Sequence, residues 1–194
     1  MEDFTINKKH KALLDTSREL FWKYGFRRVT IDEICREAKT SKMTFYRFFP
    51  NKLELARTVL DQFYDENLKS LREFHQLDSS PSDKMKRILE MKLEWTNDIS
   101  NEFLQDFYIN PELGLSQYIE EKTGIILTEI IKFFQIGQDE GWIRKDIKVE
   151  FLLFLIQKTS GMISDRELLK LYNSTQDLIM ELTNLFVYGI SPTK

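Results

Sequence analysis

The sequence predicts an all-α protein, on three observations. Its 194 residues include only seven glycines and four prolines, so tight turns are few. Apolar residues recur three and four positions apart over long segments, as they do along one face of a helix. Several of these segments open with a residue that caps helices. No strand pattern and no internal repeat accompanies them, so we expect helices joined by short connections.

Four helices are predicted near the N-terminus, over residues 8–24, 30–38, 41–49 and 51–74. Gly25 follows the first helix, in the position where glycine commonly ends helices. Side-chain oxygens are placed to cap the other three, at Thr30, Ser41 and Asn51. Thr30 and Glu33 together form a capping box. Pro50 ends the third helix because it pushes Phe49 out of helical geometry.

Five further helices are predicted, over residues 81–100, 103–109, 112–140, 149–164 and 174–188. Ser80 is placed to cap the first of them, with Pro81 at its first position. The third begins after Asn110-Pro111, near Glu112, and Gly141 ends it.

Charge divides the chain unevenly, although its net charge is only −3. Residues 1–57 hold 13 Lys and Arg against 8 Asp and Glu, whereas residues 58–194 hold 15 against 23. A basic segment joined to an acidic one indicates a module that faces nucleic acid and a second module with another role. We therefore predict two domains, residues 1–57 and residues 58–194, connected through the long helix that they share.

The predicted location is the cytoplasm. The single cysteine, Cys35, cannot form an internal disulfide and suits a reducing compartment. No apolar run approaches the ~18 residues that span a membrane. The N-terminal residues lack the apolar core and cleavage site of a signal peptide. We therefore expect no membrane partner.

The two short helices over residues 30–49 have the pattern of a helix-turn-helix motif. At 100° per residue, the inner side of the second helix holds Ser41, Phe45, Phe48 and Phe49. Its outer side holds Met43, Tyr46 and Arg47, with Lys42 and Thr44 at the margins. A cationic outer side suits the DNA major groove, in which the second helix of such a motif lies.

The side chains of this outer side have the chemistry of base and phosphate contacts. Arg47 and Lys42 can donate to guanine edges or to phosphates. Met43 and the methyl group of Thr44 can contact a thymine methyl, and Tyr46 can donate its hydroxyl to a phosphate. Two residues at helix starts add expected contacts to the DNA backbone: Thr30 and Lys52. The alternative is a three-helix domain whose exposed face is basic for no such reason.

The run VTIDEICREAKTSKMTFYRFFPNKLEL resembles the N-terminal DNA-binding domain of the TetR family of transcriptional regulators. The residues that match the family pattern are Thr30, Ile34, Ala38, Ser41, Thr44, Tyr46, Phe49, Lys52 and Leu55. The resemblance implies contacts to DNA bases or phosphates from Thr30, Ser41, Lys42, Met43, Thr44, Tyr46, Arg47 and Lys52. Helix-turn-helix proteins commonly bind as dimers at half-sites one helical turn apart. The expected partners are therefore a palindromic double-stranded DNA operator and a second copy of the chain.

Two residues depart from the family pattern. Lys39 stands where the turn usually has glycine, and Met43 stands where the recognition helix usually has glycine. A non-glycine residue in left-handed geometry costs on the order of 1–2 kcal/mol, so we expect the turn to bend differently. The larger side chain of Met43 changes which bases are read.

The helices after residue 80 supply aromatic residues for an effector pocket. The residues predicted to line it are Trp95, Ile99, Phe103, Phe107, Tyr118 and Phe133. Trp95, Ile99, Phe103 and Phe107 form an apolar ridge at four-residue steps. A second ridge at the same spacing is acidic and holds Glu90, Glu94, Asp98, Glu102 and Asp106. We expect a small hydrophobic or cationic effector; the alternatives are a plain aromatic core and a solvated acidic face. We expect no cofactor, and a metal on this ridge would have no histidine nearby.

The last two predicted helices form the expected dimer interface. Residues 151–156, FLLFLI, are apolar nearly all round, which is typical of a helix buried on both sides. The predicted interface residues are Phe151, Phe154, Leu155, Leu178, Leu182, Leu185 and Phe186. The alternative is that these side chains only close the core of a single chain.

These observations predict a TetR-type regulator, a repressor that a small-molecule effector releases from its operator. Effector binding would tilt the shared helix over residues 51–74 and change the separation of the two recognition helices. One alternative is a regulator of the same fold without an effector. The other is a helical enzyme, with no catalytic residue predicted. His10 and His75 are the only histidines and are expected to be exposed, and the chain has no nucleophile elbow, phosphate loop or zinc spacing.

Overall fold

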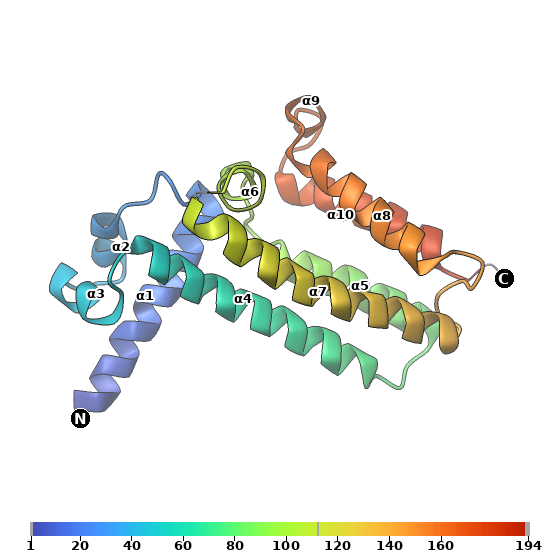
Figure 1. Ribbon diagram of the computed structural model, residues 1–194, viewed down its shortest axis with the longest axis horizontal. Helices are drawn as coiled ribbons and strands as arrows, with labels where there is room; N and C mark the ends of the chain where they lie inside the picture. The colour runs from blue at the N-terminus through green and yellow to red at the C-terminus, as the bar shows by residue number, and fades with distance from the viewer. Residues whose placement is uncertain (1, 112, 193–194) are drawn as a thin grey trace. The chain divides into compact units, whose positions relative to one another are not determined.

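The computed structural model describes residues 2–111 and 113–192. All regular structure in these residues is helical, which confirms the predicted all-α class (Figure 1). The chain forms two compact units, one of residues 1–64 and 98–121 and the other of residues 65–97 and 122–194. Two long helices run from one unit into the other, α4 (Lys52–His75) and α7 (Leu113–Asp139). No helix in the described part of the chain is long and apolar enough to cross a membrane.

These units differ from the two continuous segments expected from charge. Residues 98–121 pack with the N-terminal residues instead of with the rest of the segment over residues 58–194. The assignment of a DNA-binding role to residues 1–57 and a ligand-binding and dimerisation role to residues 58–194 stays a prediction.

The first unit begins with three helices, α1 (Glu2–Tyr24), α2 (Ile31–Glu37) and α3 (Lys42–Phe48), which contact one another (Figure 1). α2 and α3 begin at the predicted caps. Thr30 Oγ1 accepts a hydrogen bond from the backbone N–H of Glu33 at 3.1 Å, and Ser41 Oγ accepts from Thr44 N–H at 3.1 Å. Fully buried side chains from these helices and from the start of α4 form the core: Leu13, Phe21, Ile34, Phe45 and Leu55.

Residues 98–121 complete the first unit through α6 (Asn101–Leu104) and a one-turn π-helix, η1 (Gln105–Ile109). Ser100 Oγ donates to the carbonyl oxygen of Trp22 at 2.7 Å, and the rings of Trp22 and Phe103 lie 4.3 Å apart between centroids. The backbone N–H of Arg27 donates to Asp106 Oδ2 at 2.8 Å. This segment is therefore attached to the C-terminal end of α1 and to the residues that follow it.

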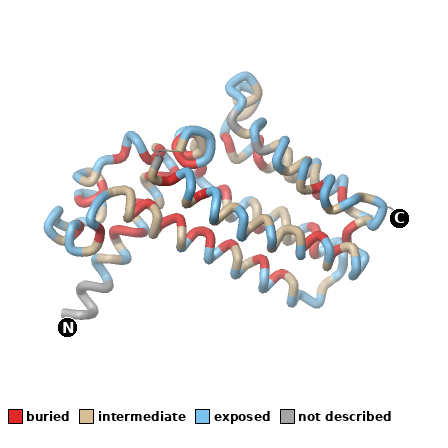
Figure 2. Tube along the Cα trace, in the orientation of Figure 1, coloured by how far each residue is buried: buried red, intermediate tan, exposed pale blue. Residues whose placement is uncertain are grey.

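The second unit contains α5 (Pro81–Trp95), α8 (Val149–Ser160), a 3-10 turn η2 (Gly161–Ser164), α9 (Arg166–Leu169) and α10 (Thr175–Ile190). Its core combines aromatic and aliphatic side chains and includes Phe74, Phe133, Phe134, Trp142, Ile143 and Leu152. In Figure 2 buried positions recur along α4 and α7 between exposed ones, the pattern of helices with one apolar face.

Several helix boundaries differ from the prediction. α1 begins at Glu2, six residues before the predicted start at residue 8. α5 ends at Trp95 instead of near Ser100, because Thr96 caps it through the carbonyl oxygen of Lys92 and Asp98 then takes a left-handed φ of 58°. The helix expected to end at Ser164 finishes as a 3-10 turn, and the short helix α9 was not predicted. The expected start at Glu112 lies outside the described residues. Both predicted glycine stops are confirmed, with left-handed φ at Gly25 and Gly141.

Candidate functional site

The outer side of α3 is exposed. Of the four residues predicted on its inner side, Phe45 and Phe49 are buried, Phe48 is half-buried and Ser41 is exposed. Met43 and Tyr46 are 83% and 55% exposed, and Arg47 is exposed beside them. Arg47 forms no ion pair with any residue that the structure describes. Phe45 and Phe49 face the core, as the helical phase predicted. The structure thus leaves one apolar, one phenolic and one cationic side chain together on a single short helix.

The turn between α2 and α3 is built on Lys39, which has a left-handed φ of 51°. The N–H of Thr40 donates to the carbonyl oxygen of Cys35 at 2.9 Å, and the N–H of Lys39 donates to that of Arg36 at 3.2 Å. This is the hydrogen-bond pattern of a Schellman motif, which normally places glycine at the left-handed position. The prediction that the turn bends differently here was wrong. Lys39 adopts the left-handed conformation usual for glycine, and its side chain makes that conformation strained.

Lys42 is held at the start of α3 by an ion pair with α2. Its Nζ lies 2.6 Å from Asp32 Oδ1, and both side chains are more than half exposed. The carboxylate of Asp32 raises the pKa of Lys42. Ser41 and Thr44 share a hydrogen bond of 3.0 Å between their hydroxyls. The first turn of α3 is therefore ordered by contacts within the chain.

Lys52 holds the connection between α1 and α2. Its ammonium donates to the carbonyl oxygens of Phe26 at 2.7 Å and Val29 at 2.8 Å, and lies 4.2 Å from the centroid of the Phe26 ring. Carbonyls bound in this way fix the loop that ends at Thr30. The phosphate contact expected from Lys52 stays a prediction, and these hydrogen bonds give the residue a structural role as well.

The six residues predicted to line an effector pocket fall into both units. Trp95 and Phe133 line an apolar pocket of about 250 Å³ in the second unit. The other predicted apolar positions, Ile99, Phe103 and Phe107, are buried in the first unit. Tyr118 also lies there, and its hydroxyl donates to Asp61 Oδ1 at 2.5 Å. The structure therefore brings two of the six together at a cavity.

The predicted acidic ridge does not border this pocket. Glu90 and Glu94 form ion pairs with Arg87, and Asp106 is buried beside Arg27 in the first unit. No aspartate or glutamate is among the described residues that line the pocket.

Sequence reasoning missed Lys92, the one charged side chain among the described residues that line the pocket. A signal was available in the helical phase. Lys92 follows Ile88 by four residues and precedes Trp95 by three, so it lies on the apolar face of α5 with them and with Met91.

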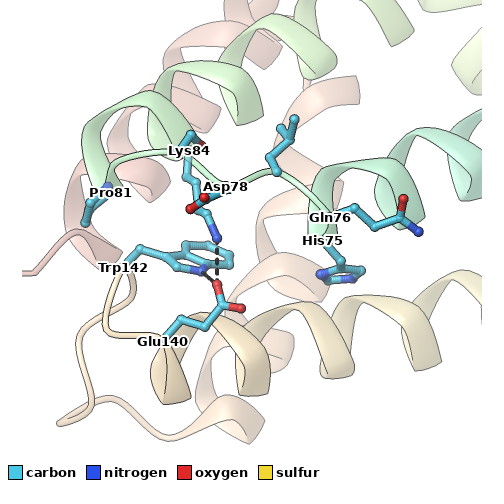
Figure 3. A pocket seen from close by; sticks show the side chains of 9 residues that line it. His75, Gln76, Asp78, Pro81, Lys84, Glu140 and Trp142 are labelled. Atoms are coloured by element: carbon cyan, nitrogen blue, oxygen red, sulfur yellow. Dashed lines mark hydrogen bonds and ion pairs between the residues drawn. The ribbon is translucent and has the colours of Figure 1, made fainter.

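A second, polar pocket of about 400 Å³ is lined by residues near the ends of α4 and α7. In Figure 3 the side chains of Lys84 and Trp142 meet that of Glu140. Lys84 Nζ lies 2.6 Å from Glu140 Oε2, and the indole N–H of Trp142 donates to the same oxygen at 2.8 Å. These two donors lower the pKa of Glu140, Lys84 being the larger cause. The pocket thus contains a lysine whose charge is paired.

Neither histidine is exposed as expected. The ring of His10 is stacked on Phe49 with centroids 5.3 Å apart. Both ring nitrogens of His75 are buried at the wall of the polar pocket and have no hydrogen-bond partner among the described residues. Burial lowers the pKa of His75. No cluster of three or more metal-ligating side chains occurs within residues that the structure describes.

The predicted dimer residues divide between surface and interior. Phe151 and Phe154 on α8 are each 54% exposed, and Leu185 on α10 is 74% exposed. Tyr188, which was not predicted, is 73% exposed one turn after Leu185. The remaining predicted positions are less exposed: Leu155, Leu178, Leu182 and Phe186. Leu182 and Phe186 line the apolar pocket, so α10 has an outer apolar stripe and an inner one.

Comparison with known proteins supports the helix-turn-helix assignment. Residues 13–59 match the family model of bacterial regulatory proteins of the tetR family. The chain is 28% identical over 89 residues to the uncharacterized HTH-type transcriptional regulator YuxN of Bacillus subtilis, a match that covers 46% of this chain and 31% of YuxN. The matches span less than a third of the length of the curated relatives.

Solved structures share the fold over almost the whole chain. Regulatory protein TetR from Rhodobacter sphaeroides superimposes with a TM-score of 0.73 at 17% identity, covering 93% of this chain and 98% of that one. The transcriptional regulator FadR from Bacillus subtilis, solved in complex with stearoyl-CoA, gives a TM-score of 0.67 at 16% identity over 93% and 98% of the two chains. The family model, the relatives and the fold agree: residues 13–59 match the tetR family of bacterial regulatory proteins, and the chain has the fold of solved regulators of this kind.

Proposed function

We propose that the chain is a cytoplasmic transcriptional repressor that binds a palindromic DNA operator as a homodimer and leaves it when a small effector binds. The observation that carries the proposal is the exposed outer side of α3, with Met43, Tyr46 and Arg47 displayed on a rigidly capped helix. Such a helix fits the major groove, and a cation on its outer side can donate to a guanine edge or a phosphate.

A homodimer is supported by the apolar stripes on the surface of the second unit. Phe151 and Phe154 lie three residues apart on α8, and Leu185 and Tyr188 lie three apart on α10. Large apolar side chains grouped on helical faces of this kind mark interaction surfaces. We expect a second copy of the chain to cover these stripes, because the twofold symmetry of a homodimer matches the symmetry of the two half-sites in a palindromic operator.

An effector is supported by the apolar pocket of about 250 Å³ and by the complex of the fold neighbour FadR with stearoyl-CoA. Lys92 and Trp95 line the pocket at the end of α5, and the segment that is bonded to α1 begins close after them, at Asp98. A ligand that displaces the end of α5 would therefore act on the chain that leads into this segment.

DNA binding is tested by selecting genomic fragments with the purified protein and footprinting the enriched ones. We expect a palindromic site whose affinity falls steeply with salt, since the protein neutralises phosphates. Arg47→Ala should reduce that affinity about tenfold or more, and Tyr46→Ala should weaken it as well. Arg166→Ala removes an exposed arginine from α9 and is the matched control, expected to bind as the wild type does. Enrichment no better than random DNA would refute the proposal.

The dimer is tested by measuring molar mass in solution by light scattering. Leu185→Glu places a charge on the exposed stripe of α10 and should give monomers that bind the operator weakly. Leu171→Glu is the control, because Leu171 is 77% exposed outside either stripe. Dimers that persist in Leu185→Glu, or monomers in the wild type, would argue against this interface.

A further inference from the structure

The apolar pocket of the second unit is lined mostly by apolar side chains. Its walls come from α4, α5, α7, α8, η2 and α10 and consist mainly of aliphatic and aromatic side chains. Such a surface favours the apolar part of a ligand through burial. Three polar residues interrupt the lining, and they are Lys92, Thr159 and Thr183.

The hydroxyl groups of the two threonines already donate hydrogen bonds to backbone carbonyls. Thr159 Oγ1 donates to the carbonyl oxygen of Leu155 at 2.8 Å, and Thr183 Oγ1 donates to that of Ile179 at 2.7 Å. Both are bonds to the preceding turn of the same helix, which hold the hydroxyls in place. Neither residue therefore has a proton to donate to a ligand.

Lys92 is different: the residue is half-buried, and its ammonium has no ion-pair or hydrogen-bond partner among the described residues. Burial lowers its pKa, and no carboxylate raises it. Lys84 shows the usual arrangement on the same helix, with its ammonium 2.6 Å from Glu140. A cation among apolar side chains is costly unless an anion accompanies it. The pocket lining thus has free hydrogen-bond donors only at the Lys92 ammonium, among the described residues, and apolar surface elsewhere.

We propose that this pocket binds a small amphipathic anion, a carboxylate whose head group pairs with Lys92 and whose apolar part fills the space between α5, α7 and α10. The inference rests on the effector that the proposed function assigns to this pocket, and it specifies that effector's chemical class. The volume corresponds to roughly eight water molecules at ~30 Å³ each, which limits the buried apolar part to medium length. The pocket selects against the cationic effector considered from the sequence.

The test is calorimetric titration of the full chain with decanoate and with decan-1-ol, which share an apolar chain and differ in head-group charge. The wild type should bind decanoate roughly ten- to one-hundredfold more tightly, the preference expected of a hydrogen-bonded charge pair. Lys92→Met keeps the length and apolar character of the stem and should bind decanoate no more tightly than decan-1-ol, because an unpaired carboxylate is costlier to bury than a hydroxyl. Lys92→Arg should keep the preference for the carboxylate.

Lys86→Met is the matched control, since Lys86 lies on the same helix but is 76% exposed and paired with Glu90. It should bind both probes as the wild type does. Equal affinity of the wild type for decanoate and decanol would overturn the inference, as would a carboxylate preference that survives in Lys92→Met. The wild-type comparison decides the question even where a variant fails to fold.

Operator binding is measured separately on the same preparation. If the wild type binds its operator but shows no preference for decanoate, the proposed anionic effector is wrong and the proposed DNA-binding function is retained. If it prefers decanoate but binds no DNA, the carboxylate site at Lys92 is retained and the proposed function is wrong.

Discussion

The α2–α3 hairpin and the apolar pocket are built from the chain in opposite ways. The proposed DNA contacts all lie within residues 30–52, where caps and one turn orient a short run of side chains. The pocket collects residues between Leu71 and Ile190 from five α-helices and the 3-10 turn η2. A surface made by one segment depends on local hydrogen bonds, whereas a cavity depends on how distant segments pack. The following substitutions test that difference.

The largest effect is expected at Gly25, where distant segments of the first unit meet. Its φ is +77°, and a Cβ there would lie 2.6 Å from Asp106 Oδ2 and 3.0 Å from the carbonyl oxygen of Glu102. Asp106 accepts a hydrogen bond from Arg27 and cannot move freely. We predict that Gly25→Ala lowers the free energy of unfolding by about 3 kcal/mol, from backbone strain and the close contact together. Urea denaturation followed by circular dichroism measures it.

Gly141 provides the control because it ends α7 with nearly the same φ, +81°, but has no atom within 4 Å of an added Cβ. Gly141→Ala should cost only the backbone strain, about 1 kcal/mol. Equal losses in the two variants would show that residues 98–121 do not press against Gly25.

Sequence reasoning succeeded where structure is set locally. The caps at Thr30, Ser41 and Asn51 and the glycine stops all lie where they were predicted. It failed on residues 95–109, where four-residue steps suggested one continuous apolar ridge. Asp98 breaks that ridge with a left-handed φ, and η1 changes its phase so that Asp106 and Phe107 are both buried. The left-handed Asp98 and the π-helix depend on packing against α1, and this packing cannot be predicted from the spacing of neighbouring residues.

The candidate sites follow the same division. The outer side of α3 was predicted from the helical phase of residues 41–49 alone. Only Trp95 and Phe133 of the six predicted effector residues line the pocket, because residues 98–121 belong to the other unit. Lys92 was visible as a cation on an apolar face, but only the structure shows that no carboxylate accompanies it.

Two lysines of α5 should change stability in opposite directions when each is replaced by methionine. Lys84 is buried and its ammonium is bound to Glu140, so Lys84→Met should lower the free energy of unfolding by about 1 kcal/mol. Lys92 has no such partner, so Lys92→Met should raise the free energy of unfolding by about 1 kcal/mol. Urea denaturation of both variants at one protein concentration tests the contrast. A loss in Lys92→Met as large as that in Lys84→Met would mean that the Lys92 charge is stabilised after all.

A smaller, pH-dependent effect is predicted for His75. Its pKa in the folded chain lies below the ordinary value of 6.5, first because of burial, with Lys84 and Lys132 acting in the same direction and Glu129 and Glu140 against it. The unfolded chain therefore binds the proton more readily. The contribution of neutral His75 is complete above about pH 7 and is lost as the pH falls through 6.5 and below.

The phenylalanine substitution His75→Phe isolates this contribution, because its ring can keep the packing on Phe133 without a titrating group. The stability of the variant relative to the wild type should rise as the pH falls from 7 to 5, in paired denaturant titrations. A difference that is constant over this range would mean that His75 titrates alike in the folded and unfolded chain.

The smallest effect is predicted at Lys39, in the α2–α3 hairpin, whose structure depends on local hydrogen bonds. Glycine relieves the left-handed strain of about 1 kcal/mol or more, but it also adds backbone freedom to the unfolded chain. Lys39→Gly should therefore raise the free energy of unfolding by only about 0.5 kcal/mol. Lys39→Asn removes the same charge, tolerates the left-handed region and adds no such freedom, so it should stabilise at least as much. If both variants instead destabilise the protein, the side chain of Lys39 supports the turn, and the hairpin depends on more than its local hydrogen bonds.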